Sequence, residues 1–267
     1  MPDESARTIT DRYNREALDY RELWAPVLRQ AGASLIGRLA GEPAPRIVEV
    51  GAGVGSLLSD LRAAFPGVVI VGADRSRGML ALAPAAFPRA VMDARALALK
   101  SGSVDLVLML FMLFHLDDPC SGLREALRVL APRGRVATLT WAGEMESPAS
   151  RIWARSLDAH GAAPLDPSST ARHELVDSPE KMAALLREAG FREPDCGVEP
   201  LVSALDADHL VRLRTRMGAN KPRFDSLEPA ARAACMASAR RRMAGLTRED
   251  FVARGRVVYA IARAATS

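Results

Sequence analysis

The amino-acid sequence predicts an α/β protein with a doubly wound, mostly parallel seven-stranded sheet. From residue 46 onward, short apolar segments bounded by Gly, Pro or charged residues alternate with segments of helical spacing. A glycine-rich turn follows the first apolar segment, where a first strand would pass into a first helix. Apolar strands that alternate with helices indicate a parallel sheet covered on both faces.

Each element is expected from its own residue pattern. Residues 10–40 have helical spacing, with Tyr13, Tyr20 and Trp24 on one broad face, and residues 41–45 end that segment. Strands are expected at residues 46–50, 68–73, 90–92, 104–109, 135–141, 198–204 and 257–262. Helices are expected at residues 56–64, 76–83, 120–130 and 151–160, with a further one that Ser178 caps and Gly190 ends. Residues 206–245 form an Arg-rich helical stretch.

The chain of 267 residues is long enough for one α/β domain with a modest cap. We expect an N-terminal helical cap at residues 1–40 and a core at residues 41–267. The less regular sequence at about 144–175 and 205–248 flanks the last strands, so we expect these two insertions to cover the ligand edge of the sheet.

Composition narrows the class of protein. Hydrophobic residues make up 49% and charged residues 25%, as in ordinary globular domains. The net charge of +4 comes from arginines that form no dense patch, so no nucleic-acid partner is expected. The three cysteines are far apart and lack metal-site spacing, which suits a reducing cytoplasm. The longest apolar run, residues 106–114, is about half of the roughly 20 residues that a spanning helix needs, and no secretory signal is visible, so no membrane partner is expected.

The most informative stretch is the turn at residues 49–55, which reads EVGAGVG. Glycines there allow backbone angles that a Cβ forbids and let a ligand approach the chain closely. A dinucleotide fingerprint would need a third small residue at Ser56, whereas the third glycine comes one position early at Gly55. The pattern therefore favours another nucleoside-type ligand, although a purely structural turn stays open.

Two acidic residues follow the second and third predicted strands. Asp74 ends the second strand, where a carboxylate can accept hydrogen bonds from both hydroxyls of a ribose. The alternative is that Asp74 caps the helix that starts near Ser76. Asp93 follows the third strand and could accept from an adenine amino group beside Met92 and Ala94, but a surface aspartate is nearly as good a reading.

The order of these motifs resembles that of the class I methyltransferases that use S-adenosylmethionine (SAM). The resemblance covers about residues 45–142 and includes the segments VDLV at 104–107, LFHLD at 113–117 and RVLAPRG at 128–134. Where this family usually has a Pro-Gly-Gly turn and a His-His pair, the chain has Pro132-Arg133-Gly134 and Phe114-His115.

The resemblance implies a Rossmann-like fold, SAM as the cofactor and methyl transfer, as in small-molecule enzymes of quinone biosynthesis and natural-product formation. By this resemblance, the cofactor-binding positions are Tyr20, Glu49, Gly51, Ala52, Gly53, Asp74, Arg75, Met79, Asp93, Ala94 and Leu110.

His115 is the candidate catalytic residue, because it follows the fourth strand beside the expected acceptor space. With an ordinary pKa near 6.5, it could act as a general base on a hydroxyl or amine. Alternatively, it fixes the backbone of its loop. The candidate acceptor-binding residues are Phe111, Phe114, His115, Tyr13, Trp24 and Arg214.

The leading hypothesis is an enzyme that methylates an O, N or C atom of a small molecule, and we expect a monomer or a homodimer. An RNA or protein methyltransferase is the rival enzyme class, although residues 110–113 read LFML and not Asn-Pro-Pro-Tyr. A SAM-binding regulatory protein that transfers nothing is the third alternative. No metal is expected, because no Asp, Glu and His cluster stands near the fourth strand.

Overall fold

The protein is described by a computed structural model over residues 4–218 and 220–265. Its described residues form a seven-stranded sheet in the order β3-β2-β1-β4-β5-β7-β6. The strands are β1 Arg46–Val50, β2 Val69–Asp74, β3 Arg89–Val91, β4 Val104–Leu110, β5 Leu130–Trp141, β6 Arg192–Ala204 and β7 Val252–Arg263. Strands β1 to β5 pair in parallel, and β7 runs antiparallel to both β5 and β6. The predicted mostly parallel α/β sheet is confirmed.

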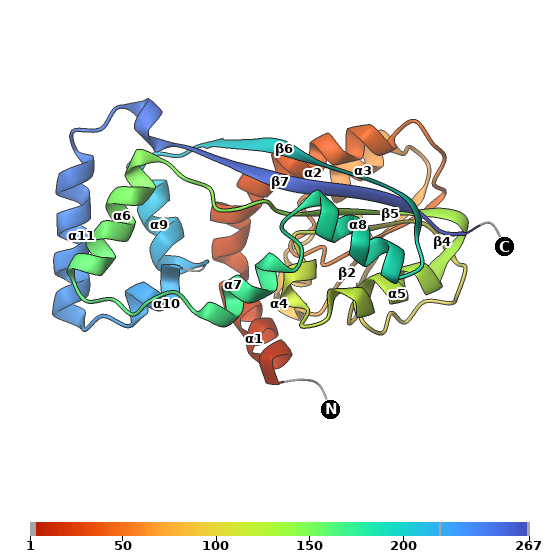
Figure 1. Cartoon of the computed structure of the whole chain (residues 1–267), viewed down its shortest axis with the longest axis horizontal. Coiled ribbons are helices and arrows are strands. Elements are labelled where there is room, and N and C mark those ends of the chain that lie inside the picture. The colour runs from red at the N-terminus through yellow and green to blue at the C-terminus, as the bar shows by residue number, and fades with distance from the viewer. Residues whose placement is uncertain (1–3, 219, 266–267) are drawn as a thin grey trace.

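Helices cover both faces of the sheet (Figure 1). On one face lie α2 (Ala25–Leu39) and α3 (Leu58–Ala64), and on the other lie α5 (Pro119–Val129) and α8 (Pro179–Glu188). The short α4 (Arg77–Ala81) follows β2. Strand β4 is buried along nearly its whole length, and the main hydrophobic core forms around it.

The sequence suggested continuous helical spacing over residues 10–40, but the N-terminal segment is not one helix. Helix α1 (Glu4–Asp19) passes into a π-helical turn, η1 (Tyr20–Trp24), and then into α2. A π turn lets the chain change direction without losing its hydrogen bonds, and such turns are common at functional sites. It places Tyr20 and Trp24 at the junction between α1 and the core.

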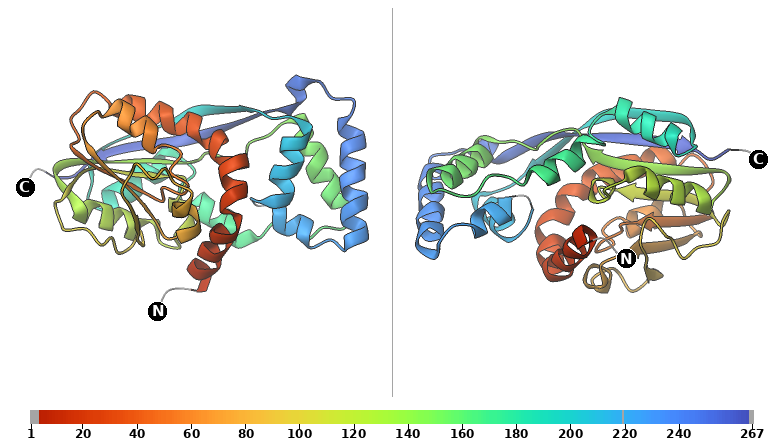
Figure 2. Two further views of the ribbon diagram at one scale, coloured as in Figure 1. Left: turned by 180° about the vertical axis from the view of Figure 1, so that it is seen from behind. Right: turned by 60° about the horizontal axis from the view of Figure 1, so that its bottom comes forward.

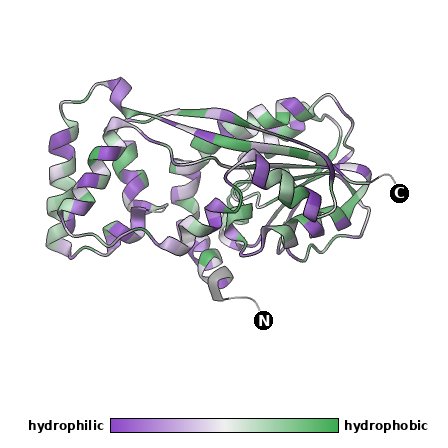
Figure 3. Ribbon diagram, in the orientation of Figure 1, coloured by the Kyte–Doolittle hydropathy of each residue, from purple (hydrophilic) through white to green (hydrophobic). Residues whose placement is uncertain are grey.

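The cap lies beyond one end of the sheet (Figure 1), and the two further views in Figure 2 show the same separation. It contains α6 (Pro148–Ala159), α9 (Ala207–Arg216), α10 (Asn220–Asp225) and α11 (Pro229–Met243). Their apolar faces form a second hydrophobic cluster that includes the fully buried Trp153. Figure 3 shows the pattern behind this arrangement, since the cap helices carry both hydrophilic and hydrophobic stripes.

The long strands differ most from expectation. They begin at Leu130, Arg192 and Val252, several residues earlier than expected. The β6–β7 ladder runs from Arg192 opposite Arg263 to Ala204 opposite Val252, and it leads into the cap through η3 (Arg248–Phe251). Backbone pairing extends these strands through polar residues that hydrophobic alternation alone does not mark.

Two helical regions differ in detail from expectation. The expected helical stretch at residues 206–245 divides, over its described residues, into α9, α10 and α11, because Gly218 at φ 73° and Pro229 at the start of α11 interrupt the periodicity. Helix α7 (Pro167–Glu174) was not expected in the Pro- and Ser-rich stretch, where Asp166 caps it. Helix α7 contacts the short 3-10 turn η2 (Leu113–His115), so this part of the insertion approaches the sheet edge.

Candidate functional site

The glycine turn between β1 and α3 bends sharply onto β2. The amides of Gly51 and Ala52 both donate to the carbonyl of Ala73, at 2.8 and 3.0 Å. Gly51 and Gly53 have φ values of 76° and 55°, which favour glycine. A Cβ on Gly51 would lie 2.8 Å from the Met112 side chain, so the turn tolerates no side chain there.

Two carboxyl groups flank this turn, the half-buried Asp74 and the buried Glu49. Asp74 accepts from the Gly53 amide and the Ser76 amide, both at 2.8 Å, and burial raises its pKa despite these bonds. Glu49 is 3% exposed, and one of its oxygens is buried without a hydrogen-bond partner. Burial, with the nearby Asp74 as a second cause, raises the pKa of Glu49 to about 8. The half-buried Asp74 carboxylate and the unpartnered oxygen of Glu49, beside an open turn, favour a ligand that supplies hydrogen-bond donors.

A cavity of about 740 Å³, including its mouth, lies at the carboxyl ends of β1, β2 and β4. This is the edge where doubly wound sheets bind ligands. Many of the predicted site residues line it together: Tyr20, Gly51, Gly53, Asp74, Arg75, Met79, Ala94 and Leu110 from the cofactor set, and Tyr13, Phe111 and His115 from the acceptor set.

Helix α1 covers this cavity and is tied to the core by side-chain hydrogen bonds. The amide oxygen of Asn14 accepts from the Ser76 hydroxyl at 2.8 Å and from the Gly78 amide at 2.9 Å. The Tyr13 hydroxyl lies 2.9 Å from Nε2 of His115. Ile9 and Thr10, each about one helical turn before Tyr13, also line the cavity. Sequence reasoning missed them because Ile9 lies before the expected helical segment and Thr10 at its first residue.

The environment of His115 suppresses its charge. Burial, followed by the nearby Arg12, His173 and Arg172, lowers the pKa of His115 to about 3. Burial likewise raises the pKa of Tyr13. The pair is therefore a neutral phenol beside a neutral imidazole, and the tautomer of His115 sets which of the two groups donates.

Phe111 forms part of the opposite wall with an unusual backbone. Its φ of 54° places a bulky residue in the left-handed region, and its amide donates to the Leu139 carbonyl at 2.8 Å. Its ring centroid lies 5.0 Å from that of Trp141, which in turn lies 5.8 Å from Trp24. Strained positions of this kind cluster at ligand sites, and here the strain sets an aromatic wall.

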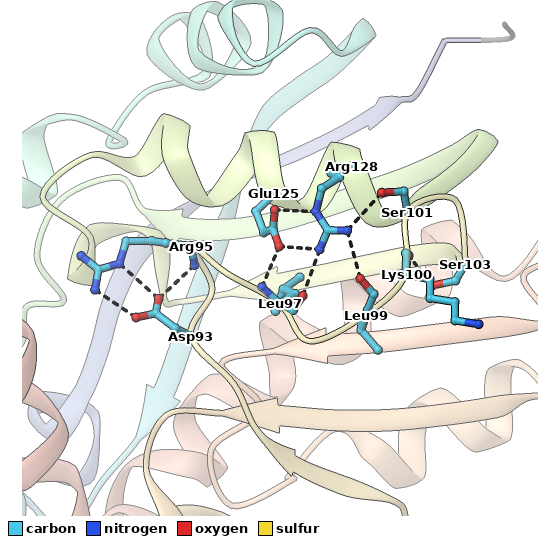
Figure 4. A network of polar contacts seen from close by, with 9 residues as sticks. All are labelled: Asp93, Arg95, Leu97, Leu99, Lys100, Ser101, Ser103, Glu125 and Arg128. Atoms are coloured by element: carbon cyan, nitrogen blue, oxygen red, sulfur yellow. Dashed lines mark hydrogen bonds and ion pairs between the residues drawn. The ribbon is translucent and has the colours of Figure 1, made fainter. Parts of the chain in front are cut away.

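The Asp93 carboxylate is turned toward Arg95 (Figure 4). The guanidinium of Arg95 donates to both carboxylate oxygens, at 2.9 and 3.1 Å, and the Arg95 amide donates at 2.9 Å. Burial opposes the shift, but the bonds from Arg95 lower the pKa of Asp93 overall. Asp93 does not line the cavity, whereas Met92 and Ala94 on either side of it do.

The loop that follows Asp93 is fixed by a second polar group in Figure 4. Arg128 donates to the carbonyls of Leu97 and Leu99, and Glu125 accepts from the Leu97 amide. These bonds attach the loop after β3 to α5. This attachment helps to fix the position of the neighbouring Met92 and Ala94, which line the cavity.

Several predicted residues lie outside the cavity lining. These are Glu49, Ala52, Asp93, Trp24, Phe114 and Arg214. Phe114 is buried and stacks on His173 of α7, with ring centroids 4.1 Å apart. The cavity also has Val50, Ser76 and Leu116 in its lining, which sequence reasoning did not place in a site. Each of them is next to a predicted site residue in the sequence, and this was the signal that could have identified them.

Over residues 4–218 and 220–265, no three His, Cys, Asp or Glu side chains gather as a metal site would require. In the same part of the chain, no helix has the length and apolar character needed to cross a membrane.

Comparison with known proteins gives the class to which this fold and site belong. A family model described as "Methyltransferase domain" matches residues 48–138. The chain is 30% identical over 225 residues to the demethylmenaquinone methyltransferase of Beutenbergia cavernae, covering 79% of this chain and 89% of the relative. The chain therefore belongs to the class I SAM-dependent methyltransferases, and its cofactor is SAM.

Other similarities are more partial. A malonyl-[acyl-carrier protein] O-methyltransferase of Hahella chejuensis is 33% identical over 138 residues, which is 49% of each chain. A Thermotoga maritima structure described as a SAM-dependent methyltransferase, possible histamine N-methyltransferase, superposes with a TM-score of 0.54 at 19% identity, covering 95% of this chain and 98% of that one. The structural likeness establishes the shared fold.

The residues present fit SAM. Bare glycine backbone lines the cavity where a Cβ would meet Met112 or Met79, which suits a flat nucleoside lying against the turn. The unpartnered buried oxygen of Glu49 and the Asp74 carboxylate suit the positive charge and the hydroxyl groups of this cofactor.

Proposed function

We propose that this methyltransferase acts on an O, N or C atom of a small-molecule acceptor held between the glycine turn and the Phe111 wall. The observation that carries the proposal is the cavity itself, which combines both sets of predicted residues under α1. A closed roof made by Tyr13 and Asn14 favours a small acceptor over a polymer. The names of the relatives, which act on demethylmenaquinone and on a malonyl group, agree with this direction.

We assign the cofactor-binding role to the turn and its neighbours, with Gly51 and Gly53 giving close backbone approach and Asp74 accepting ribose hydroxyls. Met79 packs beside the turn, and Glu49 lies buried just before it with one oxygen left unpartnered. When bound, SAM supplies a methyl group already activated by the positive charge of its sulfonium. The protein then has to bring the acceptor within about 3 to 3.5 Å of that methyl group, and such positioning can supply roughly 7 to 11 kcal/mol of the barrier.

We assign the acceptor to Phe111, Tyr13 and His115, with Trp24 and Phe114 supporting them from the second layer. His115 is proposed to orient the acceptor as a neutral imidazole. Its pKa of about 3 supports this role over the general-base role, since a base works best with a pKa near the working pH. Tyr13, hydrogen-bonded to His115, would share that positioning.

A methyl-transfer assay with three acceptor pools tests the proposal. Purified protein with methyl-labelled SAM would be offered metabolites below about 1 kDa, total RNA, or protein, alongside the matched variant Asp74→Asn. Label should enter the metabolite pool, and the variant should transfer much less. Transfer to RNA or protein would support the rival enzyme classes. Tight binding of SAM with no transfer to any pool would support the regulatory alternative.

A further inference from the structure

Arg214 belongs to α9, the cap helix that contacts α1 and η1 of the N-terminal segment. Figure 1 shows α9 on the side of the cap that faces this segment. One side of α9, with Leu213 and Met217, packs with Tyr20 and Trp24 of η1. Leu210 and Val211 pack instead into the cap cluster around Trp153. Arg214 belongs to the same turns of the helix, so its side chain leaves α9 where these two apolar clusters meet.

The guanidinium of Arg214 has no partner in the described structure. Its Nε is buried without a hydrogen bond, and no ion pair or hydrogen bond reaches Arg214 from residues 4–218 or 220–265. Burial lowers the pKa of Arg214, and the exposed Glu144 opposes this only through space, without forming a salt bridge.

Other arginines of the described structure have partners for their guanidinium groups, which Arg214 lacks. On the same helix, Arg212 pairs with Glu22 at 2.9 Å and Arg216 pairs with Asp19 at 3.1 Å. The buried Arg135 donates to two backbone carbonyls, and the buried Arg223 pairs with Asp158. Arg214 is half-buried, and its Nε is fully buried. A buried donor is costly unless it is satisfied, so a ligand that supplies an acceptor has an energetic reason to bind Arg214.

The surroundings of Arg214 connect it to the cavity. Leu213 packs with Tyr20, which lines the cavity, and with Trp24, which packs on Trp141. Trp141 packs on Phe111, the cavity wall. Glu144, whose charge acts on Arg214, follows Trp141 by three residues. A row of aromatic rings therefore runs from the proposed acceptor position toward the arginine.

We propose that Arg214 binds an anionic oxygen group of the acceptor, a carboxylate or a phosphate, while the acceptor's apolar or aromatic body lies along Phe111 and Trp141. This inference rests on the proposed function and specifies its substrate class. The planar fork of the guanidinium donates two parallel hydrogen bonds to such a group, which a lysine ammonium does not reproduce. The negative group also replaces the ion pair that the fold leaves unmade.

Matched aromatic probes test the charge requirement. With the protein saturated in demethylated SAM, tryptophan fluorescence would follow binding of benzoate and 2-naphthoate, their neutral amides, and phenyl phosphate. Each acid should bind at least tenfold more tightly than its amide. A preference for phenyl phosphate over benzoate would identify phosphate as the group, and the reverse would identify carboxylate.

The variants assign that preference to Arg214. Arg214→Met should abolish the difference between acid and amide, and Arg214→Lys should retain only part of it. Arg240→Met, which removes an exposed charge from α11, should leave it intact. The inference is overturned if no acid binds more tightly than its amide, or if Arg214→Met keeps the preference. Calorimetry of demethylated SAM on the unsubstituted protein and on each variant separates failure of this inference from failure of the proposed function. If the unsubstituted protein does not bind demethylated SAM, the proposed function itself is wrong.

Discussion

At the scale of single residues, the site depends on ionisable groups that the fold keeps neutral. The pKa shifts of Glu49 and His115 are opposite in sign but have the same origin, because burial favours the uncharged form of each side chain. An uncharged site can accept a positively charged cofactor without first separating an internal ion pair. Each shift also links folding stability to pH in a defined direction.

Glu49 should make the protein less stable as pH rises. Its pKa increases from 4.5 to about 8 on folding, so its contribution is fully present below pH 4.5 and is lost as pH rises toward 8. The expected slope is on the order of 1.4 kcal/mol per pH unit within that window. The pKa of His115 is lowered from 6.5 to about 3, so the stability that His115 contributes is lost only as pH falls below 6.5. Between pH 6.5 and 8, the contribution of Glu49 therefore changes with pH and that of His115 does not.

Denaturant unfolding at pH 6.5 and pH 8 measures this effect. The unfolding free energy of the unsubstituted protein should fall by about 1 to 2 kcal/mol more than that of Glu49→Gln. Equal falls in the two proteins would show that Glu49 is not held protonated in the folded state.

Substitution of His115 should distinguish orientation from proton transfer. Glutamine keeps a hydrogen-bonding group of similar reach but takes no proton, so His115→Gln should keep kcat within about tenfold across pH 6 to 9. His115→Ala should chiefly raise KM for the acceptor, because the partner of Tyr13 is lost. A loss of about 10²- to 10⁴-fold in kcat for His115→Gln, with unchanged SAM affinity, would instead identify a general base.

At the scale of elements, α1 is the part of the fold that closes the site. It lies on α4 through Asn14, and the π turn η1 gives it a direction different from that of α2. Its attachment consists of a few hydrogen bonds and a small apolar cluster that includes Ala17 and Met79. Such an element opens at a lower energetic cost than the core beneath it.

Gly78→Ala should displace α1 without harming α4. A Cβ on Gly78 would lie 2.8 Å from the Asn14 carbonyl oxygen and 2.9 Å from its Cα, whereas alanine otherwise favours the helix. Loss of two hydrogen bonds at about 0.5 to 1.5 kcal/mol each should weaken binding of demethylated SAM by roughly tenfold. Calorimetry would measure the affinity, and hydrogen exchange in residues 7–19 would report the loosening.

Gly37→Ala is the matched control, because a Cβ there meets no atom within 4 Å. It should leave both the affinity and the exchange rates unchanged. Unaltered binding in Gly78→Ala, despite faster exchange in α1, would mean that the helix does not contribute to holding the cofactor.

At the scale of the whole molecule, the cap and the core have separate hydrophobic clusters joined by continuous strands. The paired β6 and β7 run from the edge of the sheet to the cap helices, as Figure 1 shows. Arg212 and Arg216 add ion pairs between α9 and the N-terminal segment. We therefore expect the cap and the core to unfold together.

Trp153→Ala tests this coupling. The side chain is 1% exposed at the centre of the cap cluster, so its removal should cost about 3 to 5 kcal/mol. If the cap unfolds with the core, the denaturant midpoint should fall while the m value stays the same. Trp153→Phe should cost less. A core transition, followed through Trp24 and Trp141, that kept its midpoint in Trp153→Ala would show that the cap unfolds independently.

The sequence alone determined the sheet, the glycine turn and the position of Asp74, because these depend on hydrophobic period and turn chemistry within a few residues. It also marked Tyr13, Phe111 and His115 as neighbours of one edge of the sheet. Only the tertiary structure decided that Tyr13 hydrogen-bonds to His115, 102 residues away, and that Asp93 pairs with Arg95. It likewise showed that the Nε of Arg214 is buried without a hydrogen-bond partner. Such contacts depend on how α1 and the cap pack onto the core, and the local pattern of residues does not specify that packing.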